Sequence, residues 1–217
     1  MIEKLFELIA PDECLGCGTE GKCLCFGCEE KSTIAKVPAC VMCNKQNTDN
    51  RVCKRCRAKT SISGASIAYR YSGITKDLIS RMKYENGRSV ARYFAALLPR
   101  VELSCEQVVC CVPCDGPSRR ARGYDQAELI AKHYARFNHL KYRNILLRIE
   151  HKKQVGRSRQ ERFKNVQGNF EAKGDIQGLN VILIDDVITT GATISECAKT
   201  LRLAGAKKVW AVAVAKK

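Results

Sequence analysis

The sequence contains no apolar run long enough to cross a membrane as a helix. Such a helix needs about 18 consecutive apolar residues, and no stretch of the 217 residues approaches that length. The first residues, MIEKLFELIAPDEC, carry acidic side chains where a signal peptide would carry a basic region and a long apolar core. We therefore expect a cytoplasmic protein without a membrane span.

Acidic residues are scarce relative to basic ones. The chain has 22 Asp and Glu against 38 Lys and Arg, which gives a formal net charge of +16 and a pI near 9.4. Such an excess favours anionic partners, whether nucleic acid, acidic lipid or a polyphosphate ligand. The alternative is a cytosolic protein that is merely basic.

Histidine is scarce as well. His133, His139 and His151 are the three in the chain, and they lie outside the motifs that carry chemistry. No Ser-His-Asp or Cys-His arrangement is apparent, so covalent catalysis by an activated serine or cysteine is not indicated.

Cysteine, in contrast, is abundant and concentrated in the first 60 residues. Nine of the fourteen cysteines fall between Cys14 and Cys56. Eight of them form four Cys-x-x-Cys pairs, namely Cys14 and Cys17, Cys25 and Cys28, Cys40 and Cys43, Cys53 and Cys56. Two such pairs can hold one zinc ion at roughly 2.3 Å in a closed tetrahedral site. We therefore predict two structural zinc ions, with Cys23 left over.

Two alternatives to zinc fit this pattern less well. A redox dithiol would need one reactive pair rather than four, and an iron–sulfur cluster usually has other spacings. Sequential pairing of the four motifs minimises loop closure, although interleaved pairing stays open. The module is either purely structural or also grips a nucleic acid or partner protein, with Lys54, Arg55 and Arg57 as candidates.

The cysteine-rich part gives way to a different pattern near residues 57–66. We predict a double zinc-ribbon module over 1–60 and a larger domain over 61–217. SIAYRY, QVVCCVP, VILI and VWAVAV resemble strands, and TKDLISRMKY, SVARYFAALL, AELIAKHYARF and SECAKTLRLAG have helical spacing. Apolar strands that alternate with helices indicate an α/β fold with a central parallel sheet covered on both faces.

The stretch VILIDDVITTGAT, residues 181–193, suggests a ligand site. The strand is expected to end at Ile184 and to deliver Asp185 and Asp186 to the carboxyl edge of the sheet, where α/β folds bind ligands. The following hydroxyls, glycine and helix N-terminus suit a phosphate monoester. Two carboxylates beside a phosphate make sense if the ligand also presents hydroxyls or a divalent cation, as a phosphorylated sugar does. The alternative is a helix N-cap preceded by solvated acidic residues.

This stretch resembles the phosphoribosyl pyrophosphate (PRPP) signature of type I phosphoribosyltransferases. The resemblance implies that Asp185 and Asp186 face the ribose hydroxyls. It also implies that a loop wraps the 5-phosphate, with the residues Thr189, Thr190, Gly191, Ala192 and Thr193. Magnesium would accompany PRPP and screen the leaving pyrophosphate.

Two further blocks resemble the ComF family of competence proteins within that superfamily. CVPCDGPSRRARGYDQAELIA is similar to the family's strand, basic loop and Arg-Gly-Phe-Asn-Gln motif, with Cys111, Cys114 and Asp125 as departures. LLRIEHKKQVGRSRQERFKNVQGNF matches the family at Gln154, Ser158, Arg162, Asn165 and Phe170.

The resemblance implies roles for these blocks. Arg119, Arg120 and Arg122 would form the pyrophosphate loop and take part in catalysis with Asp185 and Asp186, and Lys83 is a weaker candidate for the same pocket. Residues 154–170 would form a flexible hood that excludes water from the reaction.

Three functions then stay open: a phosphoribosyltransferase with an unknown acceptor, a PRPP-binding regulator without turnover, and a protein that handles single-stranded DNA or binds DNA-processing proteins during natural transformation. Dimers are common in the superfamily, so a homodimer is a further option.

Overall fold

The computed structural model describes residues 13–31, 40–43, 45, 52–84, 87–103, 106–149 and 168–217. In this part of the chain, no helix combines the length and the apolar character that crossing a membrane requires.

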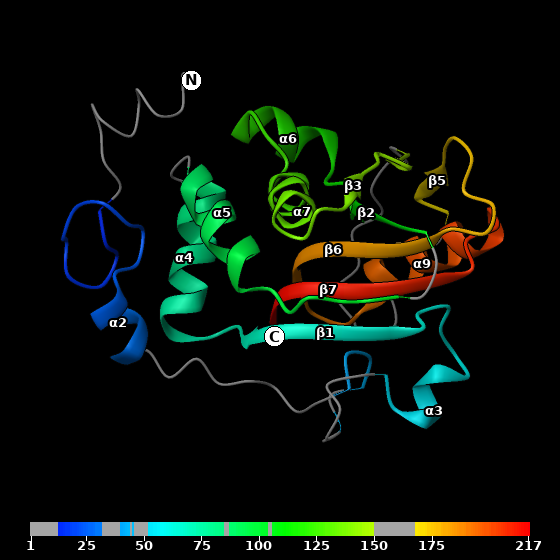
Figure 1. Ribbon diagram of the computed structural model, residues 1–217, viewed down its shortest axis with the longest axis horizontal. Helices are drawn as coiled ribbons and strands as arrows, with labels where there is room; N and C mark the ends of the chain where they lie inside the picture. The colour runs from blue at the N-terminus through cyan, green and yellow to red at the C-terminus, as the bar shows by residue number, and fades with distance from the viewer. Residues whose placement is uncertain are drawn as a thin grey trace.

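A five-stranded parallel sheet forms the centre of the molecule (Figure 1). Its strand order is β1-β7-β6-β2-β3, and every neighbouring pair is parallel. The strands span Gly64–Arg70 (β1), Gln107–Cys111 (β2), Lys141–Tyr142 (β3), Asn180–Ile188 (β6) and Lys208–Lys216 (β7). The predicted α/β fold with a parallel sheet is confirmed. The predicted strands SIAYRY, QVVCCVP, VILI and VWAVAV correspond to β1, β2, β6 and β7.

Helices cover both faces of this sheet. The elements are α4 (Gly73–Tyr84), α5 (Arg88–Leu97), α7 (Gln126–Phe137) and α9 (Ala192–Leu203). Apolar side chains of α4, α5 and α7 pack with Ile182 and Ile184 of β6, whereas those of α9 pack with Val181 and Leu183. Successive side chains of a strand point to opposite faces, so an unbroken apolar run in β6 supplies two cores at once. In Figure 1, α9 lies behind the sheet.

A second, two-stranded sheet stands beside the first. Leu146–Arg148 (β4) and Phe170–Ala172 (β5) pair antiparallel, with Arg148 opposite Phe170. The segment between them contains the predicted hood, residues 154–170, except for Phe170, which begins β5. Residues 150–167 lie outside the described part. A short helix, α6, spans Gly116–Arg122 between β2 and α7.

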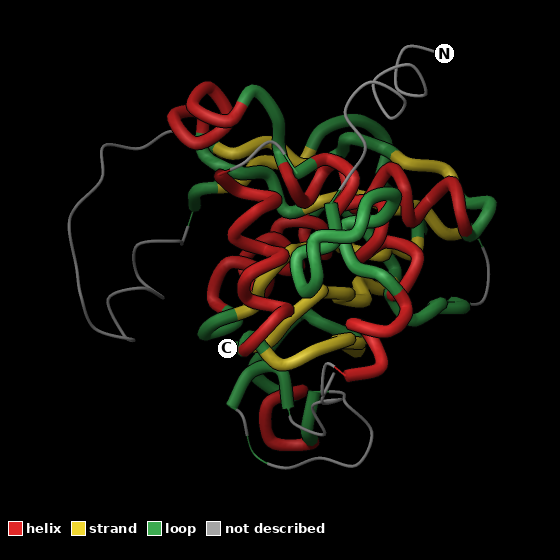
Figure 2. The backbone as a smooth tube through the Cα atoms, turned by 90° about the vertical axis from the view of Figure 1, so that its left-hand side faces the viewer, coloured by secondary structure: helices red, strands yellow, loops and turns green. Residues whose placement is uncertain are grey.

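The two cysteine-rich segments lie at separate places on the molecule. The first contains α2 (Phe26–Lys31) and the second contains α3 (Lys54–Arg57). Figure 2 shows the loop before α2 in front, facing the viewer, while α3 lies at the bottom of the molecule. The first segment shares a core with α4 and α5, and the second shares a core with α9. A division of the chain at residue 60 remains a prediction.

Candidate functional site

The acidic pair of the motif lies within strand β6 rather than beyond it. The sequence predicted a strand that ends at Ile184, which is wrong, because the ladder with β7 continues through Asp185 and Val187 to Ile188. Strand β7 has nine residues and offers backbone partners as far as Lys216. The strand therefore holds both aspartates at the carboxyl edge of the sheet, and neither is a solvated turn residue, since both side chains are partly buried.

Backbone amides and a lysine hold the two carboxylates. Asp185 Oδ1 accepts a hydrogen bond from Asp186 N at 2.9 Å, and Asp186 Oδ1 accepts one from Val187 N at 2.6 Å. Asp186 Oδ2 also forms an ion pair with Lys83 Nζ of α4 at 2.6 Å. The side chains of this pair are only 23% and 15% exposed, so the pair is shielded from solvent.

The electrostatics of the pair are asymmetric. Burial raises the pKa of Asp185 well above its ordinary value, and the adjacent Asp186 charge raises it further, although the Asp186 amide and Lys83 oppose the shift. Burial alone would lower the pKa of Lys83, but its contact with Asp186 outweighs that effect and the pKa rises. Asp185 is therefore the carboxylate with the most to gain from a polar or cationic ligand.

The loop after β6 forms a small recess. Gly191 has φ 77°, in the left-handed region that favours glycine, and helix α9 begins directly after it. Thr190 Oγ1 accepts a hydrogen bond from Ala192 N at 3.3 Å, and Lys216 Nζ donates to Thr189 O. The amides of the first turn of a helix lack intrahelical partners and suit an anion.

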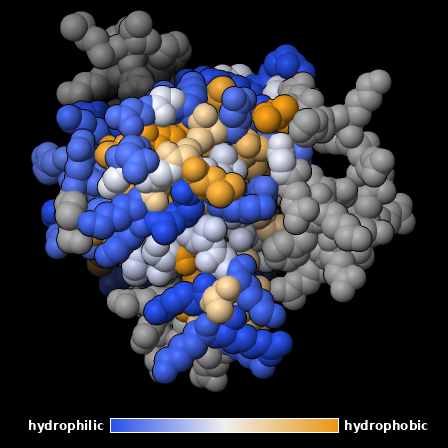
Figure 3. Space-filling model, turned by 90° about the vertical axis from the view of Figure 1, so that its right-hand side faces the viewer, coloured by the Kyte–Doolittle hydropathy of each residue, from blue (hydrophilic) through white to orange (hydrophobic). Residues whose placement is uncertain are grey.

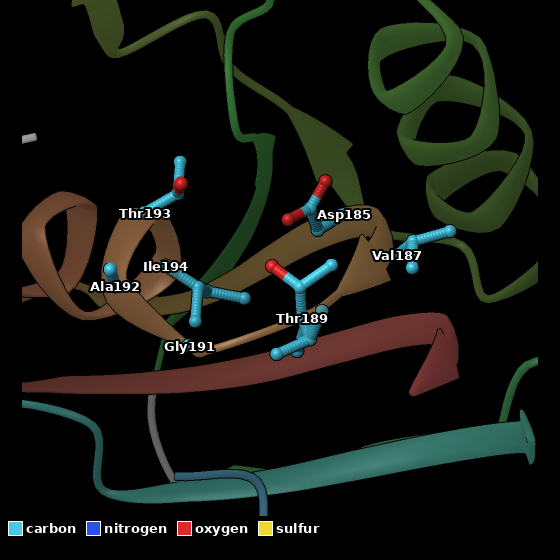
Figure 4. A pocket seen from close by; sticks show the side chains of 8 residues that line it. Asp185, Val187, Thr189, Gly191, Ala192, Thr193 and Ile194 are labelled. Carbon is cyan, nitrogen blue, oxygen red and sulfur yellow. The ribbon is translucent and has the colours of Figure 1, made fainter. Parts of the chain in front are cut away.

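Oxygen atoms of three side chains face this recess, whose volume is about 20 Å³. In Figure 4 the side-chain oxygens of Asp185, Thr189 and Thr193 point toward a common space, whereas Val187 points away from it. The predicted residues from Thr189 to Thr193 thus surround one recess beside Asp185, except that Thr190 is not among its lining residues.

A larger cavity of about 250 Å³ adjoins the recess. The two share Asp185, Val187 and Thr193. The other lining residues come from α4, from the chain between β2 and the start of α7, and from the ends of β4 and β6: Lys83, Val112, Pro113, Cys114, Asp115, Ser118, Arg122, Asp125, Gln126, Ala127, Arg148 and Asp186. A small recess lined by hydroxyl and carboxylate oxygens therefore opens beside a cavity that contains both acidic and basic groups.

The three predicted arginines belong to helix α6 rather than to a loop. Asp115 caps this helix, because its Oδ1 accepts a hydrogen bond from Ser118 N at 2.8 Å. Arg122 lines the cavity, but Arg119 and Arg120 are exposed and do not. Arg119 instead contacts Glu128 at 3.4 Å. The structure thus brings Arg122 and Lys83 to the cavity, and the predicted hood residues Gln154, Ser158, Arg162 and Asn165 lie outside the described residues.

The cavity also contains residues that the sequence analysis did not select. Asp125 joins its two walls, since Oδ2 accepts from Cys114 N at 2.8 Å and Oδ1 accepts from Glu128 N at 3.2 Å. Gln126 is 3% exposed, and its Oε1 accepts from Arg122 at 3.0 Å. Its Nε2 is buried without a partner in the described part of the chain. The Asp-Gln pair of the ComF-like motif was the signal that could have identified both residues.

Arg148 is a further basic group of the cavity. It lies at the end of β4, and its guanidinium stands over the ring of Phe170 at 5.4 Å. Residues 149–169 connect the two strands, so Arg148 marks the base of the predicted hood. Sequence reasoning missed it because one arginine among many in a basic stretch carries no signal of its own.

The eight paired cysteines form two clusters. Cluster 1 consists of Cys14, Cys17, Cys25 and Cys28, and cluster 2 of Cys40, Cys43, Cys53 and Cys56. Within each cluster the sulfur atoms lie within 4.8 Å of one another. The predicted sequential pairing is confirmed, and Cys23 is buried outside both clusters.

The sulfur geometry fits a tetrahedral zinc ion. Zinc–sulfur bonds of about 2.3 Å place the sulfurs of a tetrahedron about 3.8 Å apart. Cys17 Sγ and Cys25 Sγ are 3.6 Å apart, and Cys43 Sγ and Cys53 Sγ are 3.8 Å apart. Both clusters can therefore hold a zinc ion, and in each one a backbone amide also donates to the first cysteine sulfur.

One thiol of each cluster is prepared for ionisation. Burial opposes ionisation of Cys14 and Cys40, but hydrogen bonds from backbone amides outweigh it and lower the pKa of each to about 6. The thiolate is the form that binds a metal. Two similar clusters in one chain thus share the same local chemistry.

The chain is similar to a known domain family over its C-terminal part and to known proteins over most of its length. The family model for the phosphoribosyl transferase domain matches residues 145–217. The chain is 30% identical over 207 residues to competence protein F of Haemophilus influenzae, covering 88% of this chain and 90% of that protein. It is 26% identical over 190 residues to competence protein ComFC of Bacillus subtilis, covering 82% of this chain and 77% of that protein.

Among solved structures, the glutamine PRPP amidotransferase from B. subtilis matches 56% of this chain with a TM-score of 0.37 and 25% identity. The chain spans about a quarter of that enzyme, 24% of its length.

The central parallel sheet, its flanking helices and the matched domain define a phosphoribosyltransferase-type fold, to which two N-terminal cysteine clusters are added. More narrowly, the chain belongs to the ComF family of competence proteins.

Proposed function

We propose that this protein binds PRPP with Mg²⁺ and transfers the phosphoribosyl group of PRPP to an acceptor, and that this activity takes part in DNA uptake. The proposal depends on one observation, that a small recess and a larger cavity adjoin each other and that Asp185 lines both. The small recess has threonine hydroxyls, and the larger cavity has three basic side chains, Lys83, Arg122 and Arg148.

This arrangement matches the two ends of PRPP. The 5-phosphate would occupy the recess at residues 189–193, where the N-terminus of α9 favours negative charge. The ribose hydroxyls would lie over Asp185 and Asp186, and the pyrophosphate would extend into the cavity. Mg²⁺ prefers carboxylate, water and phosphate oxygens, and the two aspartates with the pyrophosphate would supply them.

The chemistry requires the cavity to hold developing negative charge. A nucleophile on the acceptor forms a bond to the ribose C1 while the bond from C1 to the pyrophosphate oxygen breaks. Bound magnesium would supply charge neutralisation for the leaving group. Arg122 is prepared for the same task, because Gln126 accepts from it at 3.0 Å and the Tyr84 ring lies 5.8 Å from its guanidinium carbon.

The test is release of pyrophosphate. The full-length protein would be incubated with PRPP and Mg²⁺, alone and with nucleobases or single-stranded DNA as acceptors. Release that depends on an acceptor supports transfer. Tight binding of PRPP without release of pyrophosphate in the presence of any of these acceptors would refute the enzymatic activity and leave a PRPP-binding regulator. Failure to bind PRPP at all would refute the site.

A second function, binding of single-stranded DNA, is favoured by one surface. Four exposed basic residues lie in and beside α3, namely Lys54, Arg55, Arg57 and Lys59. Figure 3 shows mostly hydrophilic side chains at the bottom of the molecule, where Figure 1 places α3. The curated relatives are named as competence proteins. Neutralisation of phosphates would make the affinity fall steeply with salt. A flat salt response, or unchanged affinity after replacing Arg55 and Arg57 by glutamate, would contradict this role.

A further inference from the structure

The loop that forms the phosphate recess is supported from behind by cluster 2. A Cβ atom added at Gly191 would lie 2.9 Å from Met42 Sδ and 3.4 Å from the Val41 carbonyl oxygen. Val41 and Met42 are the two residues between Cys40 and Cys43. The metal-binding turn therefore packs directly against the residue on which the phosphate loop reverses, so that a methyl group at this position would displace the Met42 side chain.

A second contact ties the far end of cluster 2 to the same loop. Thr60, four residues after Cys56, shares a hydrogen bond of 3.1 Å with Ser195, where either hydroxyl can donate. Ser195 lies in the first turn of α9, and its amide donates to the Gly191 carbonyl at 3.0 Å. The two contacts reach the loop at its apex and at the start of the helix that follows it.

Apolar packing joins these contacts into one unit. Cys40 and Val41 are fully buried, and they belong to the same core as Ile188 and Ile194, the residues on either side of the loop. The back of the phosphate loop is thus built from cluster 2, while the front is left for the ligand.

Cluster 1 makes different contacts in the part of the chain that the structure describes. Cys14 belongs to the core of α4 and α5, and a Cβ at Gly16 would meet Cys28 and Ile74. Its segment is also joined to α4 by a hydrogen bond from Arg81 to the Glu13 carbonyl at 2.7 Å. The two clusters have the same chemistry in different surroundings, which makes one a control for the other.

We infer that cluster 2 positions the phosphate loop, so that its metal occupancy, and not that of cluster 1, sets the affinity for the 5-phosphate of the ligand. The inference rests on the proposed function, because it assigns that phosphate to the recess at Gly191. Glycine has little conformational preference of its own. The turn at Val41 and Met42 orders the loop before the ligand binds. When the turn lacks its metal, the conformational entropy cost of ordering the loop falls on ligand binding instead, and the affinity is lower.

The first test removes the supporting side chain without touching a ligand or a metal-binding residue. Met42→Ala is compared with Met42→Leu in the full-length protein, with ribose 5-phosphate as the titrated ligand and zinc measured by elemental analysis. Ordering one more residue on binding weakens affinity by a factor of roughly 5–30. We expect that loss for Met42→Ala, near-normal affinity for Met42→Leu, and unchanged zinc content in both. Equal affinity of the two variants would overturn the inference.

The second test compares the clusters. Cys43→Ser and Cys17→Ser each remove the second cysteine of a cluster, and each should lose one zinc ion. Only Cys43→Ser should weaken binding of ribose 5-phosphate, by about tenfold or more. Equal weakening in both would show a general loss of stability and would overturn the inference. If Cys43→Ser does not fold, the methionine pair decides.

Failure of the two ideas can be told apart. A wild-type protein that binds neither ribose 5-phosphate nor PRPP overturns the proposed function and the inference with it. A wild-type protein that binds both, with variants that bind equally well, overturns only the role of cluster 2.

Discussion

Replacing Asp185 by asparagine should stabilise the ligand-free protein and weaken its binding of PRPP. Asp185 is partly buried beside a second carboxylate, and its raised pKa reflects first its burial and then the charge of Asp186. Like charges a few ångströms apart repel by about 1 kcal/mol even in water. Asparagine keeps an oxygen for the hydrogen bond from the Asp186 amide, so the repulsion is lost and the backbone contact is retained.

Replacing Asp186 by asparagine should have the opposite effect on stability. The ion pair with Lys83 is 2.6 Å long, and its side chains are 23% and 15% exposed. Its contribution to stability should therefore lie between that of a surface ion pair and that of a fully buried one. Breaking it should cost about 2–3 kcal/mol, of which relief of the repulsion from Asp185 returns about 1 kcal/mol, so the net loss is about 1–2 kcal/mol. The unfolding entropy of a 217-residue chain is about 0.46 kcal/mol/K, so the unfolding temperature should fall by about 2–4 °C. Asp185→Asn should raise it by about 2 °C.

Thermal unfolding followed by circular dichroism, without ligand, measures both changes, and calorimetric titration with PRPP and Mg²⁺ measures binding. Both variants should bind PRPP more weakly than the wild type. Shifts of the unfolding temperature in the same direction would refute the electrostatic reasoning, whatever the binding result. Unchanged PRPP binding in both would refute the assignment of the site.

The pH dependence gives a further check on Asp185. Its pKa is higher in the folded protein than in the unfolded chain, so the folded state holds this proton more tightly. Its contribution to stability is therefore full at low pH and is lost as pH rises through the folded pKa. The advantage of Asp185→Asn should be largest at neutral and alkaline pH and should disappear below about pH 4.

Three other predictions concern the metals and the cavity. Elemental analysis should find two zinc ions per chain, and their removal by a chelator should lower the unfolding temperature; a chain without metal would overturn both sites. Arg122→Ala should weaken PRPP binding by about tenfold or more, and Arg119→Ala, on the same helix but outside the cavity, should change it little; equal losses in a titration would contradict the geometry. Gln126→Glu places a negative charge on a buried residue that lines the cavity, so it should weaken PRPP binding more than ribose 5-phosphate binding, and equal weakening would contradict a contact with the pyrophosphate.

Most of the sheet could be predicted from the sequence because its strands are buried on both faces. An apolar run such as VILI or VWAVAV has no polar face, which is the property of a covered parallel strand. The end of β6 could not be predicted in this way. Asp185 and Asp186 have the composition of a turn, but β7 extends beside them and its backbone continues the ladder. Tertiary pairing thus overrode the local preference.

The candidate site was only partly predictable for a similar reason. The phosphate loop is one continuous segment with its own chemistry, so its residues identify it. The cavity is assembled from separate elements, and single residues such as Arg148 and Gln126 acquire a role only when β4 and α7 come together with β6. Arg119 and Arg122 lie about one helical turn apart, yet Arg122 lines the cavity whereas Arg119 contacts Glu128.

The place of cluster 2 in the fold is related to how the two faces of the central sheet are covered, which the cysteine spacing does not report. Three helices, α4, α5 and α7, cover one face, but α9 alone among the long helices of the described chain packs on the other. Cys40, Val41 and Val52 fill part of that second face together with the short sheet of β4 and β5. A metal-closed turn is a rigid cover that needs few residues. Because the turn at Val41 and Met42 contacts Gly191 of the phosphate loop, the structural role of cluster 2 is coupled to the geometry of the site.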